Sequence, residues 1–291
     1  MFRIDNATAA GSLPSPGAAG TPGFFQPGNP GLSIPATIVT ADWANGIQEE
    51  IMSVLTAASI TESKTSFNQL LNAIKALIGL NVSFGSQAFS TNGSHTYTPT
   101  AGMAAVLTIL TGGGGSGGGG YDATSSGGAG GAAGGTAIAF LTAAQIGTSK
   151  SLTLGVGGTG GIHGLPGSTG TNGGTSSLGA LLSATGGVAG GYGNNSNAAT
   201  PGAGGVGSGG VLNLTGQGGS PGRGSATAFD AFCFAGVGAN SFFGGGGLGG
   251  MQTNGQGGTG NNGSGGGGST GATNGGNGGD GCALFIEFII G

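Results

Sequence analysis

The spacing of hydrophobic and polar residues predicts an extended start, two helices, and then strands separated by glycine. The first 35 residues contain six prolines, which exclude a helix interior and a central strand, so we expect an extended arm. From Thr40 onward, hydrophobic residues recur at helical spacing, with Asp42 as the expected cap. A second stripe predicts a helix from about Ser63 to Leu77, ended by Gly79.

Both helices carry an apolar stripe that needs a partner. We expect the stripes to pack on each other or on copies of the chain in an oligomer. The residues are Trp43, Ile47, Ile51, Val54 and Leu55 in the first helix, and Phe67, Leu70, Leu71, Ile74, Leu77 and Ile78 in the second.

Short strands are predicted on both sides of the glycine-rich sequence. Before it, the expected strands are Val82–Phe89, His95–Thr98 and Ala104–Leu110, with Asn92-Gly93 as a hairpin turn. Later strands are expected at 137–144, 151–156, 211–214 and 282–290. The last is expected to pair with Ala104–Leu110, which brings the two ends of the glycine region together.

Glycine divides the chain into parts. Of the 77 glycines among 291 residues, 11 lie in residues 1–111 and 66 lie in residues 112–291. We therefore expect an extended arm with two helices over 1–80, a β-rich connector over 81–111, and a glycine-rich domain over 112–291.

The glycine-rich part is either a flexible linker or an ordered structure. Gly-Gly-X triplets at 157–162, 204–206 and 275–280 have the period of three that polyproline II geometry requires. A strict Gly-X-Y register and abundant proline, which collagen needs, are missing. The expected fold class is therefore mixed: a small helical and extended amino-terminal domain, followed by short β-strands and packed polyglycine II helices.

Charge is sparse and unclustered. Five basic and nine acidic residues give a net charge of −4, without the basic patch that a nucleic-acid partner needs. The sequence predicts neither a membrane span nor a signal peptide. Cys233 and Cys282 lie far apart in the sequence, and their spacing neither requires nor excludes a disulfide.

Motifs that elsewhere indicate catalysis are discounted here because glycine is so frequent. G-x-G-x-x-G at 155–160 lacks a ribose-binding acid, because no acidic residue lies between Asp122 and Asp230. The G-x-S-x-G matches at 114–118, 218–222 and 267–271 are expected by chance. His95 and His163 lie in unrelated segments, and Asp280 and Glu287 are the nearest approach to a carboxylate pair. We expect no enzyme activity, cofactor or metal site.

Five segments in the first 78 residues form a specific set: Met1-Phe2-Arg3-Ile4-Asp5-Asn6-Ala7-Thr8-Ala9-Ala10, Gly23-Phe24-Phe25, Gly28-Asn29-Pro30, residues 35–50, and Gln69-Leu70-Leu71-Asn72-Ala73-Ile74. Together they resemble the amino-terminal segment of tailed-bacteriophage tail fibre proteins, and the resemblance to that segment implies attachment to the tail and oligomerisation through residues 1–80. The remainder resembles the glycine-rich carboxy-terminal domain of some phage fibres, and polyglycine-helix adhesins of T-even-like phages are an analogue for its packing.

This resemblance implies a virion protein, made in the host cytoplasm, that docks on a tail or baseplate protein and meets a host glycan or outer-membrane protein. It also implies a homotrimer. The expected oligomer and attachment residues are Phe24, Phe25, Trp43, Ile47, Ile51, Leu70, Leu71 and Ile74. The candidate receptor-contact residues, where the Gly-Gly-X pattern breaks, are Tyr192, Asn194, Asn195, Asn197, Asn240, Phe242, Phe243, Met251, Gln252 and Asn254.

Three other functions remain open. The alternatives are a purely structural tail component, an ice-binding-type polyglycine protein, and a fibre that also hydrolyses a surface polysaccharide. An ice-binding face needs a regular row of Thr or Ala, whereas the third positions here vary among Thr, Ile, Val, Asn and Asp.

Overall fold

The computed structural model describes residues 2–78, 82–122, 126–194, 198–223, 233–251 and 254–290. The chain forms two compact units, Met1–Val82 and Ser83–Gly291. The sequence predicted a separate connector over residues 81–111. In the structure their strands belong to both sheets of the second unit.

The first unit contains an extended arm and two α-helices. The arm includes a short 3-10 helix, η1 (Pro30–Leu32), and leads into α1 (Ala41–Ala57). Thr40 is the N-cap of α1, because its side chain accepts a hydrogen bond from the backbone N–H of Trp43. The sequence predicted Asp42 as the cap, but Asp42 lies in the first turn, where a carboxylate favours the helix dipole.

Helix α2 (Gln69–Leu77) begins later than the sequence predicts. The side chain of Gln69 accepts a hydrogen bond from the N–H of Ser63 and donates one to the carbonyl of Thr61, so it stabilises a loop where we expected the first helical turn. The end predicted at Gly79 lies outside the described residues. A small core of Met52, Leu55 and Ala73 joins the two helices.

The second unit is built on two antiparallel five-stranded sheets. The first has the order β1 (Val82–Phe89), β10 (Cys282–Ile290), β3 (Met103–Thr111), β4 (Thr136–Thr142) and β9 (Leu212–Leu214). The second has the order β2 (Gly93–Tyr97), β5 (Lys150–Leu154), β6 (Ser176–Leu178), β7 (Leu182–Ala184) and β8 (Gly207–Ser208). A one-turn helix, α3 (Ala143–Ile146), lies between β4 and β5.

The predicted pairing of the terminal strand is confirmed, because β10 pairs antiparallel with β3 along its length. The hairpin predicted at Asn92-Gly93 is wrong. The turn exists, with Gly93 at φ +112°, but it leads from β1 in one sheet to β2 in the other, where β2 pairs with β5.

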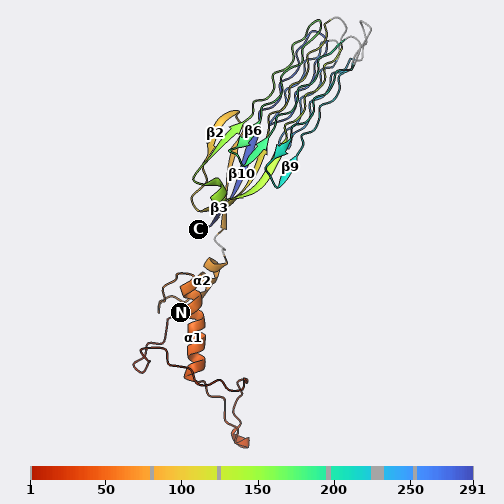
Figure 1. Ribbon diagram of the computed structural model, residues 1–291. Helices are drawn as coiled ribbons and strands as arrows, with labels where there is room; N and C mark the ends of the chain where they lie inside the picture. Colours follow the sequence, from red (N-terminus) through yellow and green to blue (C-terminus); the bar gives the residue numbers. More distant parts are fainter. Residues whose placement is uncertain are drawn as a thin grey trace. The chain divides into compact units, whose positions relative to one another are not determined.

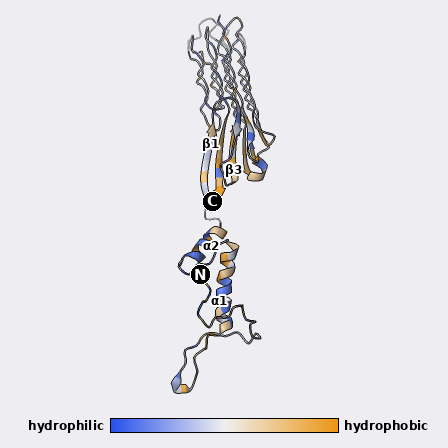
Figure 2. Cartoon of the chain, turned by 90° about the vertical axis from the view of Figure 1, so that its left-hand side faces the viewer, coloured by the Kyte–Doolittle hydropathy of each residue, from blue (hydrophilic) through white to orange (hydrophobic). Residues whose placement is uncertain are grey.

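Residues of both sheets form the hydrophobic core of the second unit. Tyr97 and Phe285 stack at its centre, with ring centroids 3.9 Å apart, among Leu110, Leu152 and Leu178. Figure 2 shows hydrophobic residues along β3, whose buried positions face this core.

From the ends of these strands the chain continues into glycine-rich runs that lie side by side (Figure 1). Three runs, 112–120, 127–135 and 264–271, are buried along their whole length. The runs around them are 155–163, 167–175, 185–193, 199–206, 215–223, 234–240, 244–251, 255–261 and 274–281.

Backbone hydrogen bonds between runs repeat every three residues. In run 112–120, Gly112, Gly115 and Gly118 donate to run 127–135, the next residue of each triplet donates to run 167–175, and the third donates to run 274–281 or to Thr273 beside it. The three buried runs also bond to one another, by Gly115 N–H to Ala132 O, Gly131 N–H to Gly266 O and Gly266 N–H to Gly115 O. Backbone groups therefore hold the bundle together where side chains cannot.

Glycine is required at the buried positions because neighbouring backbones approach too closely for a side chain. A Cβ on Gly117 would lie 2.0 Å from the carbonyl oxygen of Gly267, and one on Gly114 would lie 1.9 Å from that of Ser264. Outer runs carry larger side chains only where these point away from the bundle, as at the exposed Val156 and Ile162.

Candidate functional site

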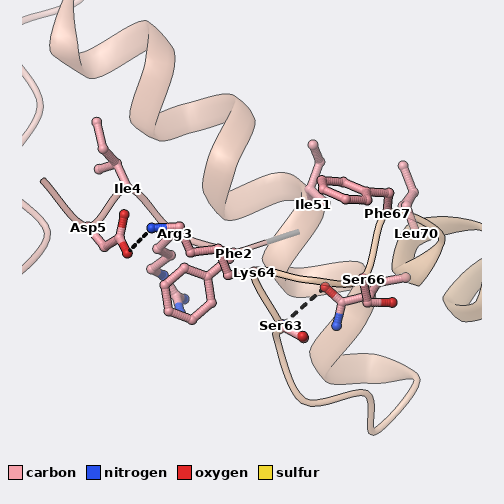
Figure 3. Close-up of a pocket in the computed structure, with 11 residues that line it drawn as sticks. Phe2, Arg3, Ile4, Asp5, Ile51, Ser63, Lys64, Ser66, Phe67 and Leu70 are labelled. Atoms are coloured by element: carbon pink, nitrogen blue, oxygen red, sulfur yellow. Dashed lines mark hydrogen bonds and ion pairs between the residues drawn. The ribbon is translucent and has the colours of Figure 1, made fainter.

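A pocket of about 480 Å³ lies in the first unit, between the amino-terminal residues and the helix pair (Figure 3). Phe2 and Ile4 line one side of it, and Ile51, Phe67 and Leu70 line the other. Apolar side chains therefore line both sides of the pocket, and charged side chains at Arg3, Asp5 and Lys64 complete its lining.

Charged side chains hold the amino-terminal wall of this pocket in place. The Arg3 guanidinium bridges Glu49 at 2.8 Å and Glu62 at 3.0 Å, and Lys64 Nζ lies 2.6 Å from Asp5 Oδ2. The hydrogen bond from Arg3 lowers the pKa of Glu49. Because these groups come from distant parts of the sequence, their pairing fixes residues 2–5 against the helices.

The predicted attachment residues are mostly exposed. Phe25 packs edge-to-face on Trp43 with ring centroids 5.0 Å apart, whereas Phe24 is 98% exposed. Ile51 packs beside the core of the two helices. The remaining members are exposed by 39 to 53%: Ile47, Leu70, Leu71 and Ile74. The stripe of α2 is therefore not covered by α1, which it meets through Ala73 instead.

The glycine-rich bundle of the second unit has two ends, which hold different turns. We define the near end of the bundle as the end joined to the strands, and the far end as the opposite one. Tyr192 lies at the far end, because Gly193 bonds to Gly119, close to the last residue of run 112–120. Met251 lies at the same end, paired with Phe234, whose carbonyl accepts from Arg223 at the end of run 215–223.

The predicted receptor-contact residues fall at both ends. Tyr192, Asn194, Met251 and Asn254 lie at the far end, whereas Asn195, Asn197 and Gln252 lie outside the described residues. Asn240, Phe242 and Phe243 lie at the near end. Ser241 Oγ donates to Asn262 O, and the next residue, Gly263, accepts at its carbonyl from Gly134 N–H, which lies just before β4. A full run, about 25 Å of extended chain, separates the two sets.

Several polar side chains of the outer runs bond to backbone groups. Asn274, Asn277 and Asp280 each accept from one N–H of run 155–163, at 3.1, 2.8 and 2.7 Å. Two predicted receptor residues do the same, since Asn240 Oδ1 accepts from Gly246 N–H and Asn254 Oδ1 from Ala272 N–H. These side-chain oxygens act as acceptors for backbone N–H groups of the outer runs, in place of backbone carbonyls.

A contact that the sequence did not predict joins two far-end turns. His163 Nδ1 lies 2.9 Å from Asp122 Oδ1, and the backbone of Asp122 donates to Gly164 O. The residues are 41 positions apart, and only the parallel course of runs 112–120 and 155–163 brings them together.

The carboxylates considered for catalysis both have structural partners. Asp280 lies in a glycine run, not in the turn that its Gly-Gly-Asp-Gly context favours, and it also accepts from Asn92 Nδ2. Glu287 is buried and accepts from Tyr97, Gln87 and Thr100. Burial acts to raise the pKa of Glu287, but hydrogen bonds from Thr100, Tyr97 and Gln87 outweigh it and hold the pKa below its ordinary value.

Both cysteines are buried, and burial raises the pKa of Cys282 to about 12. Among the helices of the described residues, none combines the length and the apolar character needed to cross a membrane.

Comparison with known proteins gives two findings. A stretch of 78 residues is 37% identical to the uncharacterized protein StfP of Escherichia coli K12, and this match covers 27% of the chain and 35% of StfP. The model of the glycine-rich domain family matches residues 90–286, which include strands β2 to β9, part of β10, and the bundle. This chain is therefore a member of the glycine-rich domain family.

Proposed function

We propose that this chain is a bacteriophage tail-fibre protein, which attaches to the tail through its first unit and adheres to the host surface through the far end of its glycine-rich unit. The observation that carries the proposal is the bundle, a set of backbone-bonded runs that present turns together at one end. Loops held by a rigid scaffold are the usual place for recognition.

We assign the runs to polyglycine II helices. The assignment is supported by the period of three in the inter-run hydrogen bonds and by the glycine, alanine and serine content of the buried runs. Such a scaffold needs few charged or bulky side chains, which agrees with a chain that is 5% charged and has 77 glycines.

The first unit is the attachment and oligomerisation unit in this proposal. Its exposed apolar side chains, at Phe24 on the arm and at Leu71 and Ile74 on α2, require partners in the assembled fibre. We assign the α2 stripe to contacts among three copies of the chain, and the arm and the pocket beside Phe2 to a tail or baseplate protein.

The far end is the host-facing surface in this proposal. Tyr192 and Asn194 supply the aromatic and amide groups that bind a glycan or a protein loop. Asn254 is left out because its amide oxygen already accepts from Ala272 N–H, and Met251 is left out because it pairs with Phe234 on the side of two outer runs. Asn240, Phe242 and Phe243 are not included, because they lie at the near end. We assign the chain no catalytic role and a place in the virion.

Adsorption of the full chain to cells tests the proposal. Fluorescently labelled protein is added to candidate host cells with and without an excess of unlabelled protein. Saturable and competed binding is expected. A folded chain that fails to bind a strain infected by the virion would leave it as a structural tail component.

Single alanine variants at the two ends locate the binding surface. Tyr192→Ala alters the far end, whereas Val156→Ala alters an exposed position at the near end of run 155–163. We expect the far-end variant to lose at least tenfold in affinity and the near-end control to keep it. Equal losses would contradict a host-facing far end.

A further inference from the structure

Two neighbouring outer runs of the bundle carry an exposed apolar strip. Runs 234–240 and 244–251 are antiparallel and bond through Ala235 N–H to Gly250 O and Gly238 N–H to Gly247 O, both at 2.9 Å. Their register pairs Phe234 with Met251 and places Val237 beside Leu248. These four residues, here named the apolar strip, are 47, 61, 43 and 72% exposed in that order.

The intervening glycines of these runs leave no room for a side chain, so the large side chains stand at the outward positions. A Cβ on Gly236 would lie 2.0 Å from Ser220 O, and one on Gly247 would lie 1.9 Å from Gly258 O. Outward positions tolerate polar residues equally well, as the flanking runs demonstrate with Gln217, Ser220, Gln256 and Thr259. The apolar composition of the strip is therefore not required by the bundle.

The size of the strip is that of an interaction surface. Four large side chains, each about half exposed or more, present on the order of 400 Å² of apolar surface, in the range that marks interaction sites on folded proteins. Polar rows flank the strip on both sides, as in the rim of a protein interface. A stable interface buries about 800 Å² per partner, which the strip reaches only together with these flanks.

We propose that the apolar strip packs against the glycine-rich unit of a second copy of this chain, strip to strip. In the described residues of the strip's two runs and the two flanking runs, Arg223 is the single charged residue, so like charges do not oppose self-association. Outward residues recur every three positions, about 9 Å apart, so the side chains of one strip fit between those of another.

This inference rests on the proposed function in one respect, the joining of copies through their first units. Copies joined in that way hold their second units at an effective concentration on the order of millimolar. A contact too weak to pair free domains is then sufficient to align the bundles of one fibre.

Cysteine crosslinking of the full chain tests the contact. The Leu248→Cys and Thr169→Cys variants are each treated with a short bis-maleimide reagent at equal protein concentration, and their rates of crosslinking between copies are compared. Thr169 is also exposed but lies on run 167–175, which bonds to buried run 112–120, whereas the strip's runs bond to runs 127–135 and 264–271. The native Cys233 and Cys282 are buried and do not compete for the reagent.

We expect Leu248→Cys to crosslink between copies at least tenfold faster than Thr169→Cys. Equal rates would overturn the proposal. Leu248→Ser gives a second measurement, since its outward side chain has no role in the bundle. Its thermal unfolding should match that of the unaltered chain, while crosslinking through Val237→Cys in the same chain falls at least fivefold.

Cell adsorption is measured on the same proteins to separate this inference from the proposed function. If Leu248→Ser abolishes adsorption and leaves Val237→Cys crosslinking unchanged, the strip faces the host and the proposal of self-association is wrong. If crosslinking follows the expectation but no strain adsorbs the chain, the proposed adhesion fails and the inference stands.

Discussion

Alanine substitution at a buried glycine is the sharpest perturbation of the bundle. Gly117 lies in run 112–120, and an added Cβ would meet Gly267 O at 2.0 Å and Gly267 C at 2.3 Å. Ordinary contact requires at least 3.4 Å, so the two runs must separate by about 1.4 Å. Both atoms in the way belong to backbone, so no side-chain rotation relieves the clash.

The cost follows from the hydrogen bonds that this separation breaks. Runs 112–120 and 264–271 bond beside Gly117 through Gly266 N–H to Gly115 O at 2.9 Å and Ser269 N–H to Gly118 O at 3.1 Å. Leaving a buried group unpaired costs about 1–3 kcal/mol, so two lost bonds give about 2–6 kcal/mol. This is a large part of the roughly 5–15 kcal/mol by which folded domains are stable.

The matched control is Gly245→Ala on run 244–251, where an added Cβ meets only Asn240 Oδ1, at 4.0 Å. Both substitutions reduce the entropy of the unfolded chain equally, by about 0.4–1 kcal/mol. Calorimetric unfolding of the full chain should therefore show a much less stable second unit for Gly117→Ala and an unchanged or slightly more stable one for Gly245→Ala. Equal transition temperatures for the two variants would refute the packing argument.

Three further predictions test the edge of the bundle, the sheet core and the helices. Asn277→Ala removes the acceptor for Gly160 N–H and should destabilise the second unit by about 1 kcal/mol in thermal unfolding, whereas Asn277→Asp keeps the acceptor and the stability. Because the pKa of Glu287 is lowered in the folded state, its contribution to the free energy of unfolding is present above about pH 4.3 and is lost as the pH falls through the folded pKa. Glu287→Gln should therefore reduce the loss of stability in acid, measured by unfolding at a series of pH values. An unaltered pH profile would contradict this role. Leu71→Glu with Ile74→Glu places charges on the exposed α2 stripe and should convert the proposed oligomer to monomer in sedimentation, while helix content stays constant; unchanged sedimentation would contradict the assignment of this stripe to contacts between copies.

The sequence predicted most of the elements because their signals are local. Proline in the arm, the spacing of α1, and the apolar runs of β1 and β10 each depend on neighbouring residues, and the ends of β1 and β10 were predicted to the residue. The hairpin failed because a turn signal at Asn92-Gly93 does not specify which strand the next segment joins. The predicted start of α2 at Ser63 was wrong because Gln69 accepts a hydrogen bond from Ser63 N–H and stabilises a loop there, which the helical spacing does not reveal.

The candidate sites were harder to predict because the bundle brings together residues that no local pattern connects. The sequence could identify breaks in the Gly-Gly-X pattern but not whether a break lies at the near or the far end, which depends on the direction of each run. Phe242 and Met251 are nine positions apart and lie at opposite ends of one run. Asn240 and Asn254 resemble binding residues in the sequence, yet both accept bonds from backbone of the bundle.

Hydrogen–deuterium exchange of the full chain, followed by mass spectrometry of peptides covering run 112–120, tests the central claim most directly. Every N–H of this run donates to another backbone carbonyl, so exchange requires opening of the bundle and should be slowed by several orders of magnitude, to the rate set by unfolding of the second unit. Complete exchange of these glycines within seconds, at the rate of an unstructured peptide, would contradict an ordered bundle and restore the flexible-linker interpretation.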